Sequence, residues 1–165
     1  MQNVLIIGYG NPGRLDDGLG PALVGRLEER ALPGVSLDSD YQLQVEVADA
    51  LRQHDLVVFV DAAVSGPEPF RVAEVQPSDG ASFSTHSVSP GQLLGLSRRL
   101  FQAQTRAFVV AIRGYQFDDF GERISPRAQQ NLQAAFEFLE RVLSTGNLAE
   151  LESRARTLPH QPDRD

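Results

Sequence analysis

Continuous apolar runs constrain the fold of this chain more than any other feature of its sequence. Residues 3–8 (NVLIIG) and 55–61 (DLVVFVD) form two such runs, and residues 107–112 (AFVVAI) form a further apolar strand. An apolar run without polar alternation is typical of a strand buried on both faces of a parallel sheet. Segments with helical spacing of apolar residues lie between these runs, so the sequence predicts an α/β domain.

The remaining segments complete this pattern. Helical spacing and end signals predict helices over residues 18–31, 45–53, 90–101 and about 125–144. A second strand begins at residue 35, and an alternating strand covers residues 70–75, which we expect to run antiparallel because only a short turn precedes it. We predict one three-layer α/β domain over residues 1–146, with a mostly parallel twisted sheet of about five strands and helices on both faces. Residues 147–165 are polar, and we expect a C-terminal tail that consists of a loose helix and a frayed end.

The composition of the chain excludes several classes of function. A net charge of −7 argues against a broad nucleic-acid surface, which needs clustered basic residues. The absence of Cys excludes disulfides, thiolate metal sites and a cysteine nucleophile. All 15 basic residues are Arg, so Schiff-base chemistry and the lysine of a phosphate-binding P-loop are also excluded. No apolar run approaches the ~20 residues of a membrane span, and no signal peptide is recognisable, so we expect a cytoplasmic protein.

The carboxyl ends of the predicted strands bring a few polar residues to one edge of the sheet, where open α/β sheets bind their ligands. Asp16 and Asp17 follow the first strand, and Asp61 ends the third. His86 lies in the longest loop, residues 77–91, after the fourth strand. Two or three carboxylates and one imidazole would form a divalent-metal site that suits Ni, Zn, Mn or Mg better than a structural zinc.

Each of these residues also has a purely structural explanation. Asp61 could cap a turn, and His86 could hydrogen-bond to the backbone of its loop. Asp16 or Asp17 could cap the helix that follows and stabilise its dipole. A capping role would account for one of the two adjacent carboxylates, Asp16 or Asp17, but less well for both together.

The segment after the first strand also matches a nucleotide-binding pattern. Residues 8–13 read G-Y-G-N-P-G, which is the G-x-G-x-x-G spacing of a dinucleotide-binding turn, and Asp38 or Asp40 could contact the ribose. Asp16 and Asp17 would repel a pyrophosphate at this place. A nucleotide-binding Rossmann-like module is therefore the weaker hypothesis.

Two further segments carry less information about function. No G-x-S-x-G motif is present, so a serine hydrolase of that type is not indicated. Residues 114–122 (GYQFDDFGE) are predicted to form a surface loop with solvated charges, in which Arg113, Tyr115 and Phe117 could help to bind a peptide.

Four short motifs occur in a fixed order along the chain. The most specific is G-Y-G-N-P-G-R-L-D-D-G-L-G at residues 8–20, which precedes a helix. It is followed by the strand end V-D-A-A at 60–63, by S-T-H at 84–86 before a Leu-rich helix, and by I-S-P at 124–126 after the last strand. In this combination, over about residues 1–145, the chain resembles the nickel–iron hydrogenase maturation endopeptidases.

This resemblance implies a peptidase that removes a C-terminal extension from the large subunit of a NiFe hydrogenase after nickel insertion. Asp17, Asp61 and His86 would bind the nickel that the substrate carries, and Asp16 would be their catalytic neighbour in the same turn. The metal could polarise the attacking water, or Asp16 or Asp17 could act as a general base. The resemblance implies no organic cofactor, nucleic acid or membrane partner.

The chain departs from this family after the second predicted strand. Many members have an Asp-Gly-Gly-Thr turn there, whereas residues 38–43 of this chain read D-S-D-Y-Q-L. The resemblance therefore does not identify which hydrogenase is the partner. A metal-sensing chaperone that binds the large subunit without cutting it is a second alternative.

Overall fold

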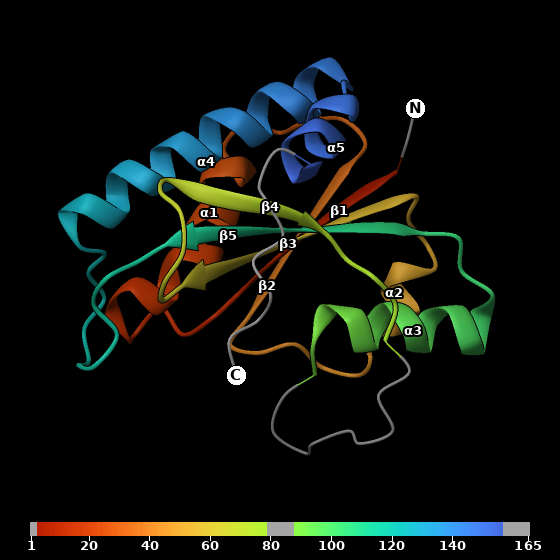
Figure 1. Cartoon of the computed structure of the whole chain (residues 1–165), viewed down its shortest axis with the longest axis horizontal. Helices are drawn as coiled ribbons and strands as arrows, with labels where there is room; N and C mark the ends of the chain where they lie inside the picture. Colours follow the sequence, from red (N-terminus) through yellow and green to blue (C-terminus); the bar gives the residue numbers. More distant parts are fainter. Residues whose placement is uncertain (1–2, 79–87, 157–165) are drawn as a thin grey trace.

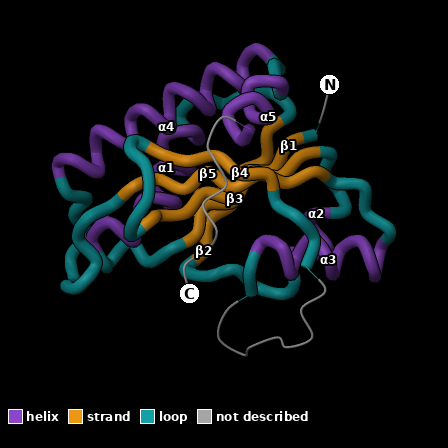
Figure 2. Tube along the Cα trace, in the orientation of Figure 1, coloured by secondary structure: helices purple, strands orange, loops and turns teal. Residues whose placement is uncertain are grey.

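A five-stranded sheet lies between two layers of helices (Figures 1 and 2). The structure is a computed structural model, and it describes residues 3–78 and 88–156. The strands are β1 (Val4–Tyr9), β2 (Val35–Asp40), β3 (Leu56–Ala63), β4 (Phe70–Glu74) and β5 (Arg106–Arg113). The helices are the short 3-10 helix η1 (Leu15–Gly18) and the α-helices α1 (Leu19–Glu28), α2 (Val47–Leu51), α3 (Pro90–Phe101), α4 (Pro126–Thr145) and α5 (Ala149–Arg156).

The sheet has the strand order β2-β1-β3-β5-β4. Four strands run parallel, and β4 pairs antiparallel with β5 at one edge. The predicted α/β class, the mostly parallel sheet and the antiparallel direction of the fourth strand are confirmed. α1, α4 and α5 cover one face, and α2 and α3 cover the other (Figure 1).

Alternate residues of the central strands enter the two apolar cores. In β1, Ile6 packs with the α1, α4 and α5 side of the sheet, and Ile7 packs with the α2 and α3 side. In β3, Val58 packs on the α1, α4 and α5 side, and Phe59 packs on the α2 and α3 side. A strand with a core on each face needs apolar residues at consecutive positions, which explains the unbroken apolar runs in the sequence.

The chain reverses its winding direction beside β1. β1 connects through α1 to β2 on one side of it, whereas β2 connects back through α2 to β3 on the other side. The two connecting helices lie on opposite faces of the sheet. In this class of sheet, ligands usually bind beside such a reversal, outside the carboxyl ends of the two strands that flank it, here β1 and β3.

Some boundaries differ from the sequence-based expectations. β3 does not end at Asp61 but continues to Ala63, because Ala62 and Ala63 still pair with β5. The helices expected over residues 18–31 and 45–53 are shorter, at Leu19–Glu28 and Val47–Leu51. Within residues 147–165, the structure contains α5, whose Leu151 is fully buried in the core that also contains α4. No helix of the described chain is both long enough and apolar enough to span a membrane.

Close contact between α1 and the sheet depends on Gly20. A Cβ atom at this position would lie 2.5 Å from the carbonyl oxygen of Val60 and 2.7 Å from that of Tyr9. We therefore expect Gly20→Ala to lower the free energy of unfolding by about 3 kcal/mol, because backbone atoms cannot move away as side chains can. Urea unfolding would measure this change.

Gly25 provides the matched control on the same helix. It is exposed, and an added Cβ would meet no atom within 4 Å. Gly25→Ala is expected to raise the free energy of unfolding by about 0.5–1 kcal/mol through helix propensity alone. Equal effects of the two substitutions would contradict the proposed role of Gly20.

Candidate functional site

The segment between β1 and α1 folds back on itself and presents Asp17 at the carboxyl edge of the sheet. Gly10 has a φ of +138°, and an added Cβ would collide with the carbonyl oxygen of Asp17, so only glycine fits there. The Asp17 carboxylate accepts a hydrogen bond of 2.8 Å from the backbone N–H of Asn11. The Asn11 side chain in turn accepts one of 2.9 Å from the N–H of Gly13. Side chains of the loop therefore close it and hold Asp17 in place.

Asp61 lies beside this loop, on the neighbouring strand. The register of β1 and β3 pairs Gly8 with Val60, so Tyr9 and Asp61 are the next residues of the two strands. The Tyr9 hydroxyl donates a hydrogen bond to the Asp61 carboxylate, which also accepts one of 2.8 Å from the N–H of Ala62. Residues of both β1 and β3 thus hold the Asp61 carboxylate.

Asp17 lies close enough to Asp61 for its negative charge to affect the pKa of the Asp61 carboxyl. Burial, with a smaller contribution from the nearby Asp17 carboxylate, raises the pKa of Asp61 to about 6 against the opposing hydrogen bonds from Ala62 and Tyr9. Burial also raises the pKa of Tyr9, with a further contribution from the negative charge of Asp61. Two carboxylates with this mutual repulsion favour a bound cation, because it neutralises both. Within the described residues, Asp17 and Asp61 are thus electrostatically coupled.

Asp16 has different surroundings from its neighbour. Its side chain is fully buried, and its two oxygens accept four hydrogen bonds of 2.7–3.0 Å. The donors are the backbone N–H groups of Tyr115, Gln116 and Ser125 and the hydroxyl of Ser125. Burial by itself raises the pKa of Asp16, but these hydrogen bonds outweigh it and hold the pKa below its ordinary value of 3.8. Asp16 is therefore a buried carboxylate that joins two distant parts of the chain.

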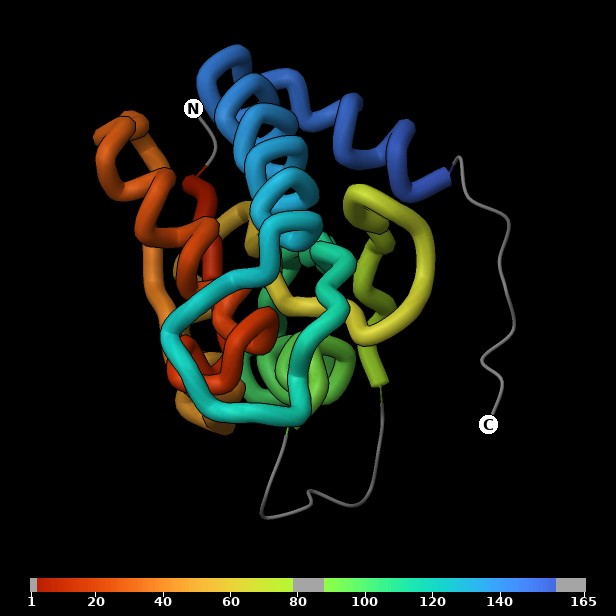
Figure 3. The backbone as a smooth tube through the Cα atoms, turned by 90° about the vertical axis from the view of Figure 1, so that its left-hand side faces the viewer, coloured from red at the N-terminus to blue at the C-terminus, as the bar shows by residue number. Residues whose placement is uncertain are grey.

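Residues 114–125 run across the loop that carries Asp17 (Figure 3). The N–H of Leu15 donates to the carbonyl of Gly121 at 2.9 Å, and the N–H of Gly121 donates to that of Gly13 at 2.8 Å. Asp118, Asp119 and Glu122 are exposed, as expected of a surface loop. The expectation of a mere surface loop was incomplete, however, because the backbone of this segment pairs with the site loop.

The structure does not support the capping explanations. No side-chain hydrogen bond caps η1 or α1, so neither Asp16 nor Asp17 acts as a helix cap. Ser125 does stand at the N-cap position of α4, but its side chain makes no capping hydrogen bond and instead donates to Asp16. Tyr9 and Asn11 carry no recognisable signal in the sequence, because only the fold brings them to their partners Asp61 and Asp17.

His86, the third expected metal ligand, lies outside the described residues. The described chain resumes at Val88, which packs against the same apolar core as Tyr9. Among described residues alone, no group of three His, Cys, Asp or Glu side chains could hold a metal ion. Asp17 and Asp61 supply two oxygen donors, so a complete site needs donors from elsewhere.

Comparison with known proteins identifies the fold. No protein-family model matches this sequence, and no curated protein matches it. Among solved structures, the hydrogenase maturation protease HycI from Thermococcus kodakarensis KOD1 superposes with a TM-score of 0.67 at 23% identity, over 86% of this chain and 92% of that chain. The hydrogenase maturating endopeptidase HybD from E. coli superposes with a TM-score of 0.64 at 19% identity, over 89% of this chain and 94% of that chain. A hydrogenase 2 maturation peptidase from Thaumarchaeota archaeon SCGC_AB-539-E09 superposes with a TM-score of 0.63 at 21% identity, over 86% of this chain and 98% of that chain.

The chain has the fold of the NiFe hydrogenase maturation proteases. The predicted resemblance is confirmed at the level of the fold, over nearly the whole chain.

In this example of the maturation-protease fold, the loop after β1 has no N–H group to offer a phosphate. Asn11 donates to Asp17, and Gly10 donates to the carbonyl of Asp40 at 3.0 Å. The remaining N–H groups, those of Gly13, Arg14, Leu15, Asp16 and Asp17, also have partners within the protein, and Pro12 has no N–H. Phosphate binding at such a turn depends on free N–H groups, so the G-x-G-x-x-G spacing here serves loop closure.

We accordingly expect no binding of NAD or ATP with a dissociation constant below about 1 mM. Isothermal titration calorimetry with each nucleotide is the measurement. Clear binding that Gly10→Val abolishes, in a variant whose circular dichroism spectrum matches that of the parent, would contradict this expectation and favour the nucleotide-binding module.

Proposed function

We propose that this protein is an endopeptidase that removes the C-terminal extension of the nickel-loaded large subunit of a NiFe hydrogenase. One observation supports the proposal: the charge of Asp17 acts on Asp61 at the carboxyl edge of β1 and β3, on the fold of the hydrogenase maturation proteases. The expected cytoplasmic location is part of the proposal.

Asp17, Asp61 and His86 are the proposed ligands of the nickel that the substrate brings to the site. Carboxylate and imidazole donors suit nickel, and the mutual repulsion of Asp17 and Asp61 favours an arriving cation. Val88, two residues after His86 in the chain, packs against the same apolar core as Tyr9, and this supports the inclusion of His86 in the proposal.

The bound nickel would supply Lewis-acid polarisation close to the scissile peptide. Hydrolysis adds the oxygen of a water molecule to the carbonyl carbon, and the leaving nitrogen takes up a proton as the C–N bond breaks. We propose a positioning role for Asp16 in place of the expected general-base role. Both of its oxygens are occupied by hydrogen-bond donors, and its side chain is fully buried.

Mass spectrometry of the C-terminal end of the hydrogenase precursor tests this function. The large-subunit precursor from the same organism would be incubated with and without the protein, in nickel-loaded and nickel-free forms. We expect loss of the C-terminal extension only when the protein and nickel are both present. A stable complex without cleavage would overturn the peptidase activity in favour of the metal-sensing chaperone, and neither cleavage nor complex would overturn both.

A further inference from the structure

Three exposed apolar side chains follow the carboxyl ends of parallel strands, at the edge of the sheet where Asp17 and Asp61 lie. Tyr41 and Val64 are each 70% exposed, and Phe120 is 81% exposed. Tyr41 directly follows β2, Val64 directly follows β3, and Phe120 lies between β5 and α4. Single exposed apolar residues are ordinary, but several at one edge of a site indicate an interaction surface.

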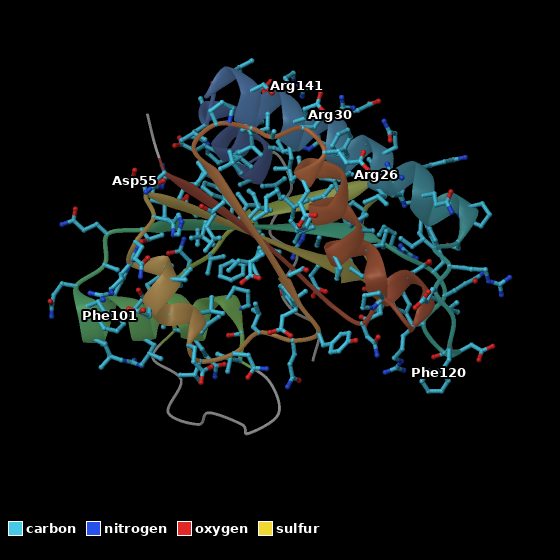
Figure 4. The ribbon with its side chains drawn as sticks, turned by 180° about the vertical axis from the view of Figure 1, so that it is seen from behind. Arg26, Arg30, Asp55, Phe101, Phe120 and Arg141 are labelled. Atoms are coloured by element: carbon cyan, nitrogen blue, oxygen red, sulfur yellow. The ribbon has the colours of Figure 1, made fainter. Side chains whose placement is uncertain are left out.

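Backbone hydrogen bonds connect the neighbours of Tyr41 and Phe120 to the site loop, and Val64 is close to Asp61 along the chain. Asp40, next to Tyr41, accepts a hydrogen bond from Gly10, and Val64 is three residues beyond Asp61 in the chain. Phe120 precedes Gly121, which pairs with the loop that carries Asp17. Phe120 projects outward at this end of the molecule (Figure 4), and the Arg14 guanidinium lies 6.0 Å from the centre of its ring. We call the surface formed by Tyr41, Val64 and Phe120 the apolar rim.

The two aromatic residues of the apolar rim share a local arrangement. An Asp precedes each of them, and its carboxylate accepts the N–H of the aromatic residue, at 2.7 Å for Asp40 and Tyr41 and at 2.8 Å for Asp119 and Phe120. Each aromatic residue thus has a fixed carboxylate beside it, and the Phe120 ring also has the Arg14 guanidinium on one side. The same segments carry further exposed carboxylates, namely Asp38, Asp118 and Glu122.

We propose that the apolar rim is the docking surface for a segment of the protein substrate in which apolar and basic side chains are neighbours. This inference rests on the proposed function for the identity of the partner. Exposed aromatic side chains are effective anchors at protein interfaces. The flanking carboxylates select a basic segment and speed its association, and they repel an acidic one.

A titration with synthetic peptides tests the docking surface without any cleavage. One peptide of about 12 residues alternates Leu with Arg, and its partner has Glu in place of every Arg. We expect the Leu/Arg peptide to shift the NMR signals of the amides of residues 41, 64 and 120 in the ¹⁵N-labelled protein, and the Leu/Glu peptide to leave them unchanged. Equal binding of both peptides, or shifts located elsewhere on the protein, would overturn the proposal.

Matched variants separate the apolar rim from general exposed apolar surface. The double variant Tyr41→Ser, Phe120→Ser is expected to bind the Leu/Arg peptide about tenfold more weakly. Leu100 on α3 is 60% exposed and lies outside the apolar rim, so Leu100→Ser is expected to change binding by less than about twofold. Circular dichroism would show whether each variant is folded, and Tyr41→Phe is expected to restore most of the affinity lost on Tyr41→Ser. An equal effect of Leu100→Ser and the double variant would also overturn the proposal.

Processing of the precursor distinguishes this inference from the proposed function. With the nickel-loaded precursor, the double variant is expected to raise KM about tenfold, with a much smaller change in kcat. Cleavage with an unchanged KM would overturn the docking surface and leave the peptidase activity standing. If the precursor is not cleaved at all, the proposed function fails, and the peptide titration still decides whether the apolar rim binds basic segments.

Discussion

Replacing Asp61 with Asn is expected to lower the rate of large-subunit processing by about 100-fold or more, because a neutral amide is a poor ligand for nickel. The substitution retains the size of the side chain and an oxygen that can accept the hydrogen bond from Ala62. Loss of activity would therefore report the charge of the carboxylate and not its packing. The measurement is the rate of C-terminal cleavage of the nickel-loaded precursor.

Stability provides an independent readout for the same variant. The pKa of Asp61 is raised to about 6, so the ionised carboxylate destabilises the folded protein at neutral pH. Asp61→Asn should then raise the free energy of unfolding by about 2 kcal/mol above pH 6. The gain should shrink as the pH falls from 6 towards the ordinary pKa of 3.8, below which the wild-type carboxyl is protonated in both the folded and the unfolded state. Urea unfolding at several pH values measures this trend.

Asp49 provides the matched aspartate control. It lies on the exposed surface of α2 and pairs with Arg52 at 2.6 Å. Such surface pairs contribute less than about 1 kcal/mol, so Asp49→Asn should leave processing within about twofold of the wild type. Wild-type activity in Asp61→Asn, or a loss of equal size in Asp49→Asn, would contradict the assignment of Asp61.

Asp16→Ala is expected to have the largest effect on stability, a decrease of about 3–5 kcal/mol in the free energy of unfolding. The substitution leaves three backbone N–H groups and the Ser125 hydroxyl without their common acceptor. Ser125→Ala removes only one of these bonds, so we expect a loss of about 1 kcal/mol for it. Urea unfolding of the two variants measures both values, and equal losses would contradict the central role of Asp16.

The pH dependence of the Asp16 contribution has a definite sign. Its pKa is lowered in the folded state, so its stabilising contribution is fully present above the ordinary value of 3.8 and is lost as the pH falls through the lower folded value. The difference in stability between the wild type and Asp16→Asn should therefore be constant near neutral pH and should decrease below pH 3.8. A difference that grows at acidic pH would contradict this assignment.

Part of the candidate site can be predicted from the sequence, because the ends of buried strands can be recognised in the linear sequence. The apolar runs that end near Gly8 and Asp61 identify two parallel strands, and the carboxyl ends of parallel strands share one edge. Asp17 and Asp61, which lie at or beyond the ends of these two runs, are therefore expected at the same edge from the sequence alone. It does not find the apolar rim, because Tyr41, Val64 and Phe120 are far apart in the chain and each resembles an ordinary exposed residue.

By itself, the sequence determines the α/β class, the strand positions and the set of acidic residues at the carboxyl edge, since all of these depend on local periodicity and composition. Only the tertiary structure decides between the adjacent residues Asp16 and Asp17, which the sequence treats as equivalent. Successive residues of a 3-10 helix point about 120° apart, so the two carboxylates meet different surroundings. Asp16 meets donors 99 to 109 residues away in the chain, whereas Asp17 remains beside Asp61. The long-range hydrogen bonds separate the structural carboxylate from the one at the candidate site, because such partners are set by the folded chain and not by local sequence.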